Sequence, residues 1–329
     1  MTPIYDNKSN TCKTIKGNHD PLISRAVCAV FLALVLLGWL ALIESYFAGF
    51  AASISFFGIL LLNNFLKYSG DNIALVTGAD YFVLVIMFWA YKHEMKELEM
   101  IAFFVVLLKL LLCGAEFLFD VLLLPFIPLV FNALLKHMPF RIILKDACKL
   151  AAGIIAASCV ALGILFLQVT LVTQSFDKTI KHFTERVAYR TFATVTIHGT
   201  DIYYNNQLIG TDAWDFLYKY LHFVIIGNND HGLNAAQYIA LLASVSVLIV
   251  IIYRRNHQRK LLALLGSTWA SLCCPLVWIT LARGHAIETG TDRFVWNLPF
   301  SLLAFVLIAE TARQGYIEVM KCCKSRTGS

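Results

Sequence analysis

The feature that most constrains this chain is a series of long apolar runs that carry almost no charge. Most runs are roughly 18 to 25 residues long, the length an α-helix needs to cross about 30 Å of hydrocarbon. Backbone amides in lipid must be satisfied within their own segment, and the runs lack the alternating pattern of a membrane β-barrel. Only 15% of the residues are charged, against about 25% in soluble domains. The sequence therefore predicts an all-α, polytopic helical membrane protein.

Eight of these runs are predicted transmembrane helices, and they fall into two groups. They cover residues 26–43, 46–66, 73–91, 101–124, 150–172, 235–253, 261–282 and 294–311. The first five form a membrane bundle over residues 26–172 and the last three a second bundle over residues 238–312. We expect the run at 101–124 to be unbroken until Pro125, and the basic stretch 135–149 to form an amphipathic helix on a membrane surface.

The long polar segment 173–237 predicts one outer loop domain of about 65 residues. Phe176, Ile180, Phe183 and Val187 follow at helical spacing and predict an amphipathic helix. Residues 194–208 alternate, contain many β-branched and aromatic residues, and predict a hairpin or irregular strand pair. Residues 212–226 predict a second amphipathic helix.

Lysine and arginine predict the orientation of the spans, because they concentrate on the cytoplasmic side. Seventeen of the 27 fall in residues 1–25, Lys67, the stretches 135–149 and 254–260, and the tail 313–329. This distribution places the N-terminal segment and the basic tail in the cytoplasm of a plasma (inner) membrane protein. The connection 92–99, the long loop and residues 283–293 are then expected outside.

The outer stretch 283–293 is short and polar, and Trp278 and Trp296 bracket it. If it is helical, His285, Glu288 and Asp292 converge on one face and are the predicted catalytic acid and base residues. Arg283 and Arg293 are the predicted substrate-binding residues, joined by Arg186 and Arg190 from the long loop, because guanidinium groups hold phosphate in a bidentate manner. The alternative is a solvated loop next to a solvated helix. With a single histidine in the stretch, no metal site is predicted.

A second candidate is an intramembrane polar seam. Lys109, Glu116 and Asp120 fall within about 40° on one stripe of a continuous helix, and Asp80 on the preceding span could join them. Ionisable groups in a span usually face the bundle interior or water. The seam either lines a substrate or ion path or is an internally paired set that fixes helix packing.

The familiar motifs of soluble chemistry are absent from the sequence. It contains no Walker loop, dinucleotide fingerprint, Gly-x-Ser-x-Gly elbow or HExxH, and so predicts neither a cofactor nor a nucleic-acid partner.

The run Trp278, ARGHA at 282–286, Asp292 and Trp296 resembles the late outer-loop run of bacterial polytopic proteins of the GT-C glycosyltransferase type. The resemblance covers about twenty residues and implies transfer of a sugar from a polyprenyl-phosphate donor at the outer face. The chain departs from that pattern where Arg283 replaces a lysine, Glu288 and Gly290 replace histidines, and Asp292 replaces an asparagine. The family also keeps a catalytic carboxylate in a long first outer loop, for which this chain offers Glu44.

We therefore expect a membrane enzyme of envelope polysaccharide assembly that uses a lipid-linked sugar. The membrane lipid is its expected partner. The alternatives are a transporter or lipid flippase that uses the seam, and a non-catalytic subunit that pairs with another membrane protein.

Overall fold

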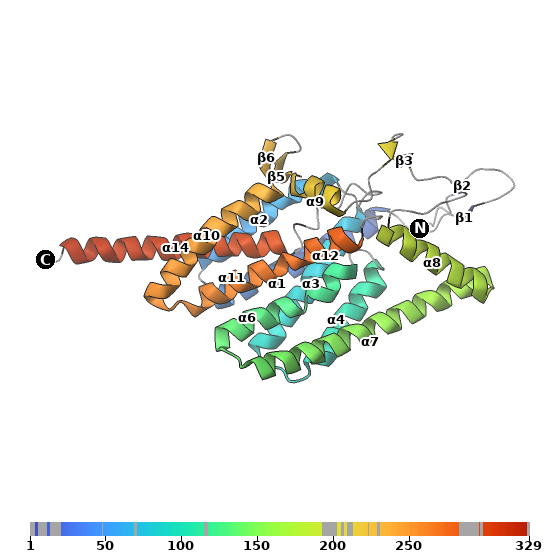
Figure 1. The fold of residues 1–329 in the computed structure, drawn as a ribbon, viewed down its shortest axis with the longest axis horizontal. Coiled ribbons are helices and arrows are strands. Elements are labelled where there is room, and N and C mark those ends of the chain that lie inside the picture. Colours follow the sequence, from blue (N-terminus) through green and yellow to red (C-terminus); the bar gives the residue numbers. More distant parts are fainter. Residues whose placement is uncertain are drawn as a thin grey trace.

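The structure is a computed structural model. It describes residues 4–5, 12–13, 21–47, 49–68, 71–114, 118–192, 203–204, 207–208, 213–222, 224–228, 231–282, 296 and 299–327. Long helices dominate this part of the chain, as predicted (Figure 1).

The first group of helices, in chain order, is α1 (Pro21–Tyr46), α2 (Gly49–Tyr68), α3 (Asp71–Lys92), α4 (Leu98–Cys113), α5 (Leu118–Leu123), α6 (Phe126–Lys136) and α7 (Phe140–Thr173). The second is α8 (Phe176–Phe192), α9 (Ala213–His222), α10 (Ala235–Asn256), α11 (Arg259–Ser271), α12 (Cys273–Leu281) and α14 (Phe300–Thr327). Three two-stranded pairs complete the described elements: β1 (Ile4–Tyr5) with β2 (Cys12–Lys13), β3 (Tyr203–Tyr204) with β4 (Gln207–Leu208), and β5 (Val224–Asn228) with β6 (His231–Asn234).

Five of the described helical stretches are long and apolar enough to cross a membrane. They are Arg25–Tyr46, Leu75–Lys92, Phe140–Thr173, Ala235–Arg254 and Arg259–Leu281. The chain is thus a multi-pass, all-α membrane protein. Within the part of the chain that the structure describes, five helical stretches reach this length and composition, and the predicted total of eight spans stays a prediction. Many leucine and phenylalanine side chains on these helices are exposed, as expected of surfaces that face lipid.

The predicted run at 101–124 is not one helix. Helix α4 ends at Cys113, Gly114 has the positive φ of 61° that a side chain would disfavour, and α5 begins only at Leu118. After Pro125 the chain continues as α6, which ends at Lys136. Helix α4 therefore leads away from one end of the bundle, and α6 brings the chain back to that end.

The predicted surface helix at 135–149 is also wrong. His137 adopts a left-handed φ of 49° and the extended Pro139 precedes α7, so the chain turns sharply between α6 and α7. From Phe140 the helix continues for 34 residues without a proline. At 1.5 Å per residue this helix is roughly 51 Å long. The basic residues at its start are therefore part of α7 and do not form a separate helix.

Helix packing is closest where α7 crosses the start of α4, and the two helices lie side by side in Figure 1. A Cβ atom built at Gly153 would lie 2.2 Å from the carbonyl oxygen of Glu99, so this contact requires glycine. Helix α1 packs along α3, where Phe31 lies beside Gly78 and Val85 beside Gly38.

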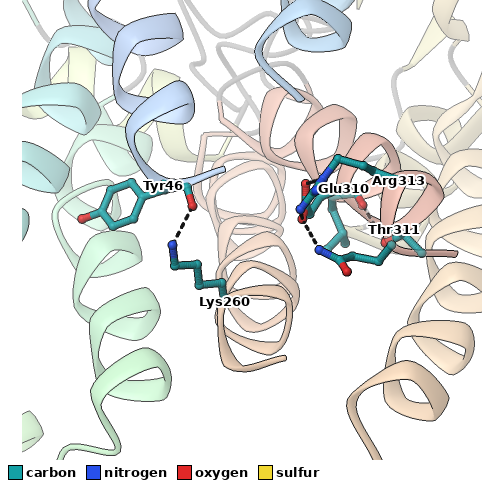
Figure 2. A network of polar contacts seen from close by, with 7 residues as sticks. Tyr46, Lys260, Glu310, Thr311 and Arg313 are labelled. Atoms are coloured by element: carbon teal, nitrogen blue, oxygen red, sulfur yellow. Dashed lines mark hydrogen bonds and ion pairs between the residues drawn. The ribbon is translucent and has the colours of Figure 1, made fainter. Parts of the chain in front are cut away.

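Several charged connections meet at one end of the bundle, which we call the Tyr46 end. Lys260 Nζ donates a hydrogen bond of 3.0 Å to the Tyr46 carbonyl oxygen (Figure 2). Lys92 Nζ lies 5.5 Å from the centre of the Tyr46 ring. Lys136 pairs with Glu94 at 2.7 Å, and this hydrogen bond lowers the pKa of the Glu94 carboxyl. The ends of α1, α3 and α6 and the starts of α4, α7 and α11 therefore share this end.

This arrangement corrects the sidedness predicted from the charge count. The prediction separated residues 44–46 and 92–99 from residues 135–149 and 254–260, whereas the structure brings all four together. The cause is helix α6, which brings the chain back to the end where α4 began, whereas the prediction had one span that crosses the membrane and stays on the other side. Relative to the segments after α6, all segments before α6 therefore lie on the side opposite to the predicted one.

The first and last described helices begin at the same end of the bundle and finish at the Tyr46 end. Helix α1 packs parallel to α3, so both helices end near Tyr46 and α1 starts at the opposite end of the bundle. Helix α14 starts beside Tyr238, passes the small cavity that Tyr46 and Val306 both line, and continues beyond the bundle toward the C-terminus (Figure 1). The start of α1 and the end of α14 thus lie at opposite ends of the bundle. The predicted cytoplasmic placement of both termini stays a prediction.

The segment between α7 and α10 confirms most of its predicted elements. Helix α8 begins at Phe176 as expected, and β3 and β4 pair on either side of residues 205–206. Helix α9 covers only 213–222 of the predicted 212–226 helix, because the chain then forms the β5–β6 hairpin. Asn234 closes that hairpin and caps α10, accepting a hydrogen bond from the Gln237 amide.

Candidate functional site

The polar segment 283–293 carries the predicted catalytic residues His285, Glu288 and Asp292 and the predicted binding residues Arg283 and Arg293. All five lie outside the described residues, so their convergence on one face stays a prediction.

The flanks of the polar segment are described and are firmly packed. Ala282 at the end of α12 is buried, and so are Trp296 and Phe300 near the start of α14. The Tyr238 ring lies 5.9 Å from that of Phe300, and its hydroxyl donates to the Ser301 carbonyl oxygen at 3.4 Å. Because α9 also contacts α12, the chain leaves and re-enters the bundle beside α9 and the start of α10. This is the end of the bundle opposite the turn between α10 and α11, as Figure 1 shows, and Lys260 places that turn at the Tyr46 end.

Helix α8 carries the two predicted arginines of the long loop. Arg186 is exposed, while the side chain of Arg190 is not among those described. The helix is attached to α7 through Phe166, whose ring lies 5.4 Å from Phe176 and 5.5 Å from Phe183. A joint site of these arginines with the polar segment therefore also stays a prediction.

The structure pairs the buried lysine of the seam with Asp80. Lys109 Nζ of α4 lies 3.5 Å from Asp80 Oδ1 of α3, and the two side chains are 0% and 1% exposed. Two charges removed from water are stabilised only by close mutual attraction and further hydrogen bonds. This pair therefore ties α3 to α4 deep in the bundle, and it includes the residue that the sequence placed on a neighbouring span.

Asp120 does not share a straight stripe with Lys109, because the helix breaks between them, and Glu116 lies outside the described residues. Asp120 is nevertheless completely buried on the short helix α5. Helix α5 packs against α12, where Cys274 lies within Coulombic reach of both Asp120 and Asp80. The break in the helix thus removes Asp120 from the predicted stripe, and α5 packs it against α12 instead.

The buried Asp120 lies on the helix that packs against α12, and α12 ends where the polar segment begins. Cys274 precedes Ala282 by eight residues of α12, which corresponds to roughly 12 Å along a helix. A carboxylate on α5 is therefore about two helical turns from the point where the polar segment begins.

Glu44 cannot work with the polar segment as the resemblance suggested. It is exposed near the end of α1, two residues before Tyr46, and so lies at the opposite end of the bundle. The physical reason is again the extra pass through α6, which moves the first turn of the chain away from residues 283–293.

Sequence reasoning missed a buried acid on α14. Glu310 is 4% exposed, and its carboxylate accepts hydrogen bonds from Arg313 Nε at 2.8 Å and Gln314 Nε2 at 2.8 Å (Figure 2). The spacing of three and four residues was the signal in the sequence, since it places all three groups on one helix face. Because the acid is satisfied within its own helix, we assign it a structural role.

Among the described residues, no group of three or more histidine, cysteine, aspartate or glutamate side chains could hold a metal ion. Comparison of the chain with family models, with curated proteins and with solved structures found no match.

Proposed function

We propose that the chain is a membrane enzyme that transfers a sugar from a polyprenyl-phosphate donor at the end of the bundle opposite Tyr46. The observation that carries this proposal is the packing of α5, which bears Asp120, against α12, which leads directly into the polar segment. Asp120 is thereby brought close to the helix that leads into the segment carrying Arg283, His285 and Arg293.

The proposed roles follow from the chemistry of the groups. Arg283 and Arg293 hold the donor phosphate through charge-assisted hydrogen bonds. His285, Glu288 or Asp292 removes the proton of the acceptor hydroxyl as its oxygen bonds to the sugar C1. The bond between C1 and the phosphate oxygen breaks, and the phosphate leaves with the electron pair. Asp120 takes the place of the carboxylate that the resemblance expects in a first outer loop.

The charge distribution supports an extracytoplasmic site. The short connections and helix ends at the Tyr46 end carry Lys92, Lys96, Lys136, Arg141, Lys145, Lys149, Arg254, Arg255, Arg259 and Lys260. Short basic connections face the cytoplasm, so the Tyr46 end is cytoplasmic in this proposal. The polar segment and the stretch from α8 to β6 then face the outside of the plasma membrane.

Alanine replacement of His285, Asp292 and Arg293, followed by glycan profiling of the envelope, tests the enzyme. We expect Arg293→Ala to lose the glycan because it no longer holds the donor phosphate. We expect His285→Ala or Asp292→Ala to lose it where that residue is the general base, whose removal lowers a rate about 10²–10⁴-fold. Glu44→Ala is the matched control and should leave the glycan unchanged, since Glu44 lies at the other end of the bundle. Unchanged glycans in all three variants, at normal expression, would remove the proposal.

A second candidate is a transporter or lipid flippase, favoured by the buried Asp80–Lys109 pair beside the break between α4 and α5. Transporters place charged side chains and interrupted helices at a site within the membrane. In this case Asp120→Asn would stop substrate movement across proteoliposomes, whereas His285→Ala would be tolerated. The enzyme predicts that Arg293→Ala is inactive because it no longer holds the donor phosphate, whereas the transporter predicts that Arg293→Ala is tolerated.

A further inference from the structure

A groove opens sideways between α1 and α3 near the Tyr46 end. It has a volume of about 400 Å³ and is lined by Gly38, Ala41 and Ser45 from α1 and by Val85, Trp89 and Lys92 from α3. Seven residues separate Gly38 from Ser45, so the groove follows α1 for roughly 10 Å. Its walls are apolar along most of this length and become polar only at Ser45 and Lys92.

The polar end of the groove is basic and open. Lys92 is exposed, ends α3, and is the last residue of a candidate membrane span, so its amine lies at the level of lipid headgroups. Its Nζ atom lies 5.5 Å from the centre of the Tyr46 ring, which holds the amine beside the groove. Trp89 is 45% exposed on the same wall, and tryptophan favours the boundary between hydrocarbon and headgroups.

A neighbouring groove on the other side of α1 provides a comparison. It has a volume of about 490 Å³, is lined by Ala52, Ser53 and Phe56 from α2, and ends at Glu44. The two grooves thus have similar size and an apolar body, but their polar ends carry opposite charges. Only the groove that ends at Lys92 is complementary to an anion.

We propose that the α1–α3 groove binds one anionic phospholipid. The phosphate accepts hydrogen bonds from the Lys92 ammonium group, and one acyl chain lies between α1 and α3 as far as Gly38. The membrane supplies this ligand, because the groove opens on the surface of two candidate spans. The site is separate from the proposed enzyme site, which lies at the other end of the bundle.

Native mass spectrometry of the purified full chain tests this site, with phosphatidylglycerol and phosphatidylcholine of equal chain length as probes. We expect one phosphatidylglycerol to be retained in preference to phosphatidylcholine. Lys92→Gln should weaken this binding about fivefold, the effect of one basic residue near a headgroup. Gly38→Leu should also weaken it by filling the groove, and a Cβ at Gly38 would meet Val85 Cγ1 at an ordinary 3.4 Å.

Two controls separate this site from general attraction to lipid. Lys96→Gln removes the same charge from the same end but from outside the groove, and Ser53→Leu fills the groove that ends at Glu44. Neither control should change the retained phosphatidylglycerol. Equal weakening by Lys92→Gln and Lys96→Gln, equal weakening by Gly38→Leu and Ser53→Leu, or equal retention of both lipids would each overturn the proposal.

Discussion

Lys109 shows how one residue acquires its role from a neighbouring helix. Helical spacing along its own span suggested Glu116 and Asp120 as partners, whereas the structure places Asp80 Oδ1 of α3 at 3.5 Å from its amine. A buried charge is tolerated where an opposite charge meets it across an interface. Which acid pairs with Lys109 depends on how α3 packs against α4. The spacing of residues within one helix does not reveal that packing.

The ion pair makes a prediction at this scale. Asp80→Asn should lower the free energy of unfolding in detergent by about 3 kcal/mol, because it removes the nearby carboxylate from a buried ammonium group. The double variant Asp80→Asn, Lys109→Met should recover much of that loss. Thr77→Val is the matched control, since Thr77 is buried one turn earlier on α3 and its hydroxyl has no hydrogen-bond partner among the described residues. An effect of Asp80→Asn no larger than that of Thr77→Val would show that the pair does not stabilise the bundle.

At the scale of elements, the contact between α4 and α7 decides where the first half of the chain turns. Helix α7 approaches the backbone of α4 at Gly153, where any side chain would collide with the carbonyl of Glu99. This close approach keeps the starts of both helices at the Tyr46 end. It also requires that α6 bring the chain back to that end before α7 begins.

Two glycines of α7 form a matched pair for testing this contact. Gly153→Ala should lower the unfolding free energy by about 1–3 kcal/mol, the usual effect of overpacking against backbone. Gly163→Ala on the same helix should be neutral or slightly stabilising, because nothing lies within 4 Å of its added Cβ and alanine favours a helix. Unfolding by denaturant in detergent measures both. Equal behaviour of the two variants would contradict the close approach.

At the scale of the whole molecule, the return through α6 sets which connections share a side. Residues 92–97 and 254–260 meet at the Tyr46 end, while α8, α9 and the β5–β6 hairpin lie at the other. Charge counting alone could not reach this result, because it treated residues 101–124 as one crossing. In the structure the chain leaves the Tyr46 end through α4 and returns to it through α6.

Thiol labelling of intact cells tests this topology in a variant without native cysteines. A cysteine at Glu185 on α8 should react with a membrane-impermeant reagent in intact cells, since we place that end outside. Cysteines at Glu94 and His257 should react only after lysis, because Tyr46, Lys92 and Lys260 hold both connections at one end. Labelling of Glu94→Cys and His257→Cys from opposite sides would contradict the structure and restore the arrangement predicted from charge.

The sequence by itself determined the membrane class, the positions of most long helices, α8 and the β3–β4 pair. These features depend on apolar run length and local periodicity, which act over neighbouring residues. The tertiary structure alone decided the partner of Lys109, the burial of Asp120 against α12, the separation of Glu44 from the polar segment and the return through α6. Each of these depends on contacts between helices distant in the chain. In lipid an apolar residue gains little by facing another helix instead of the hydrocarbon, so the apolar pattern of a span does not reveal its neighbour.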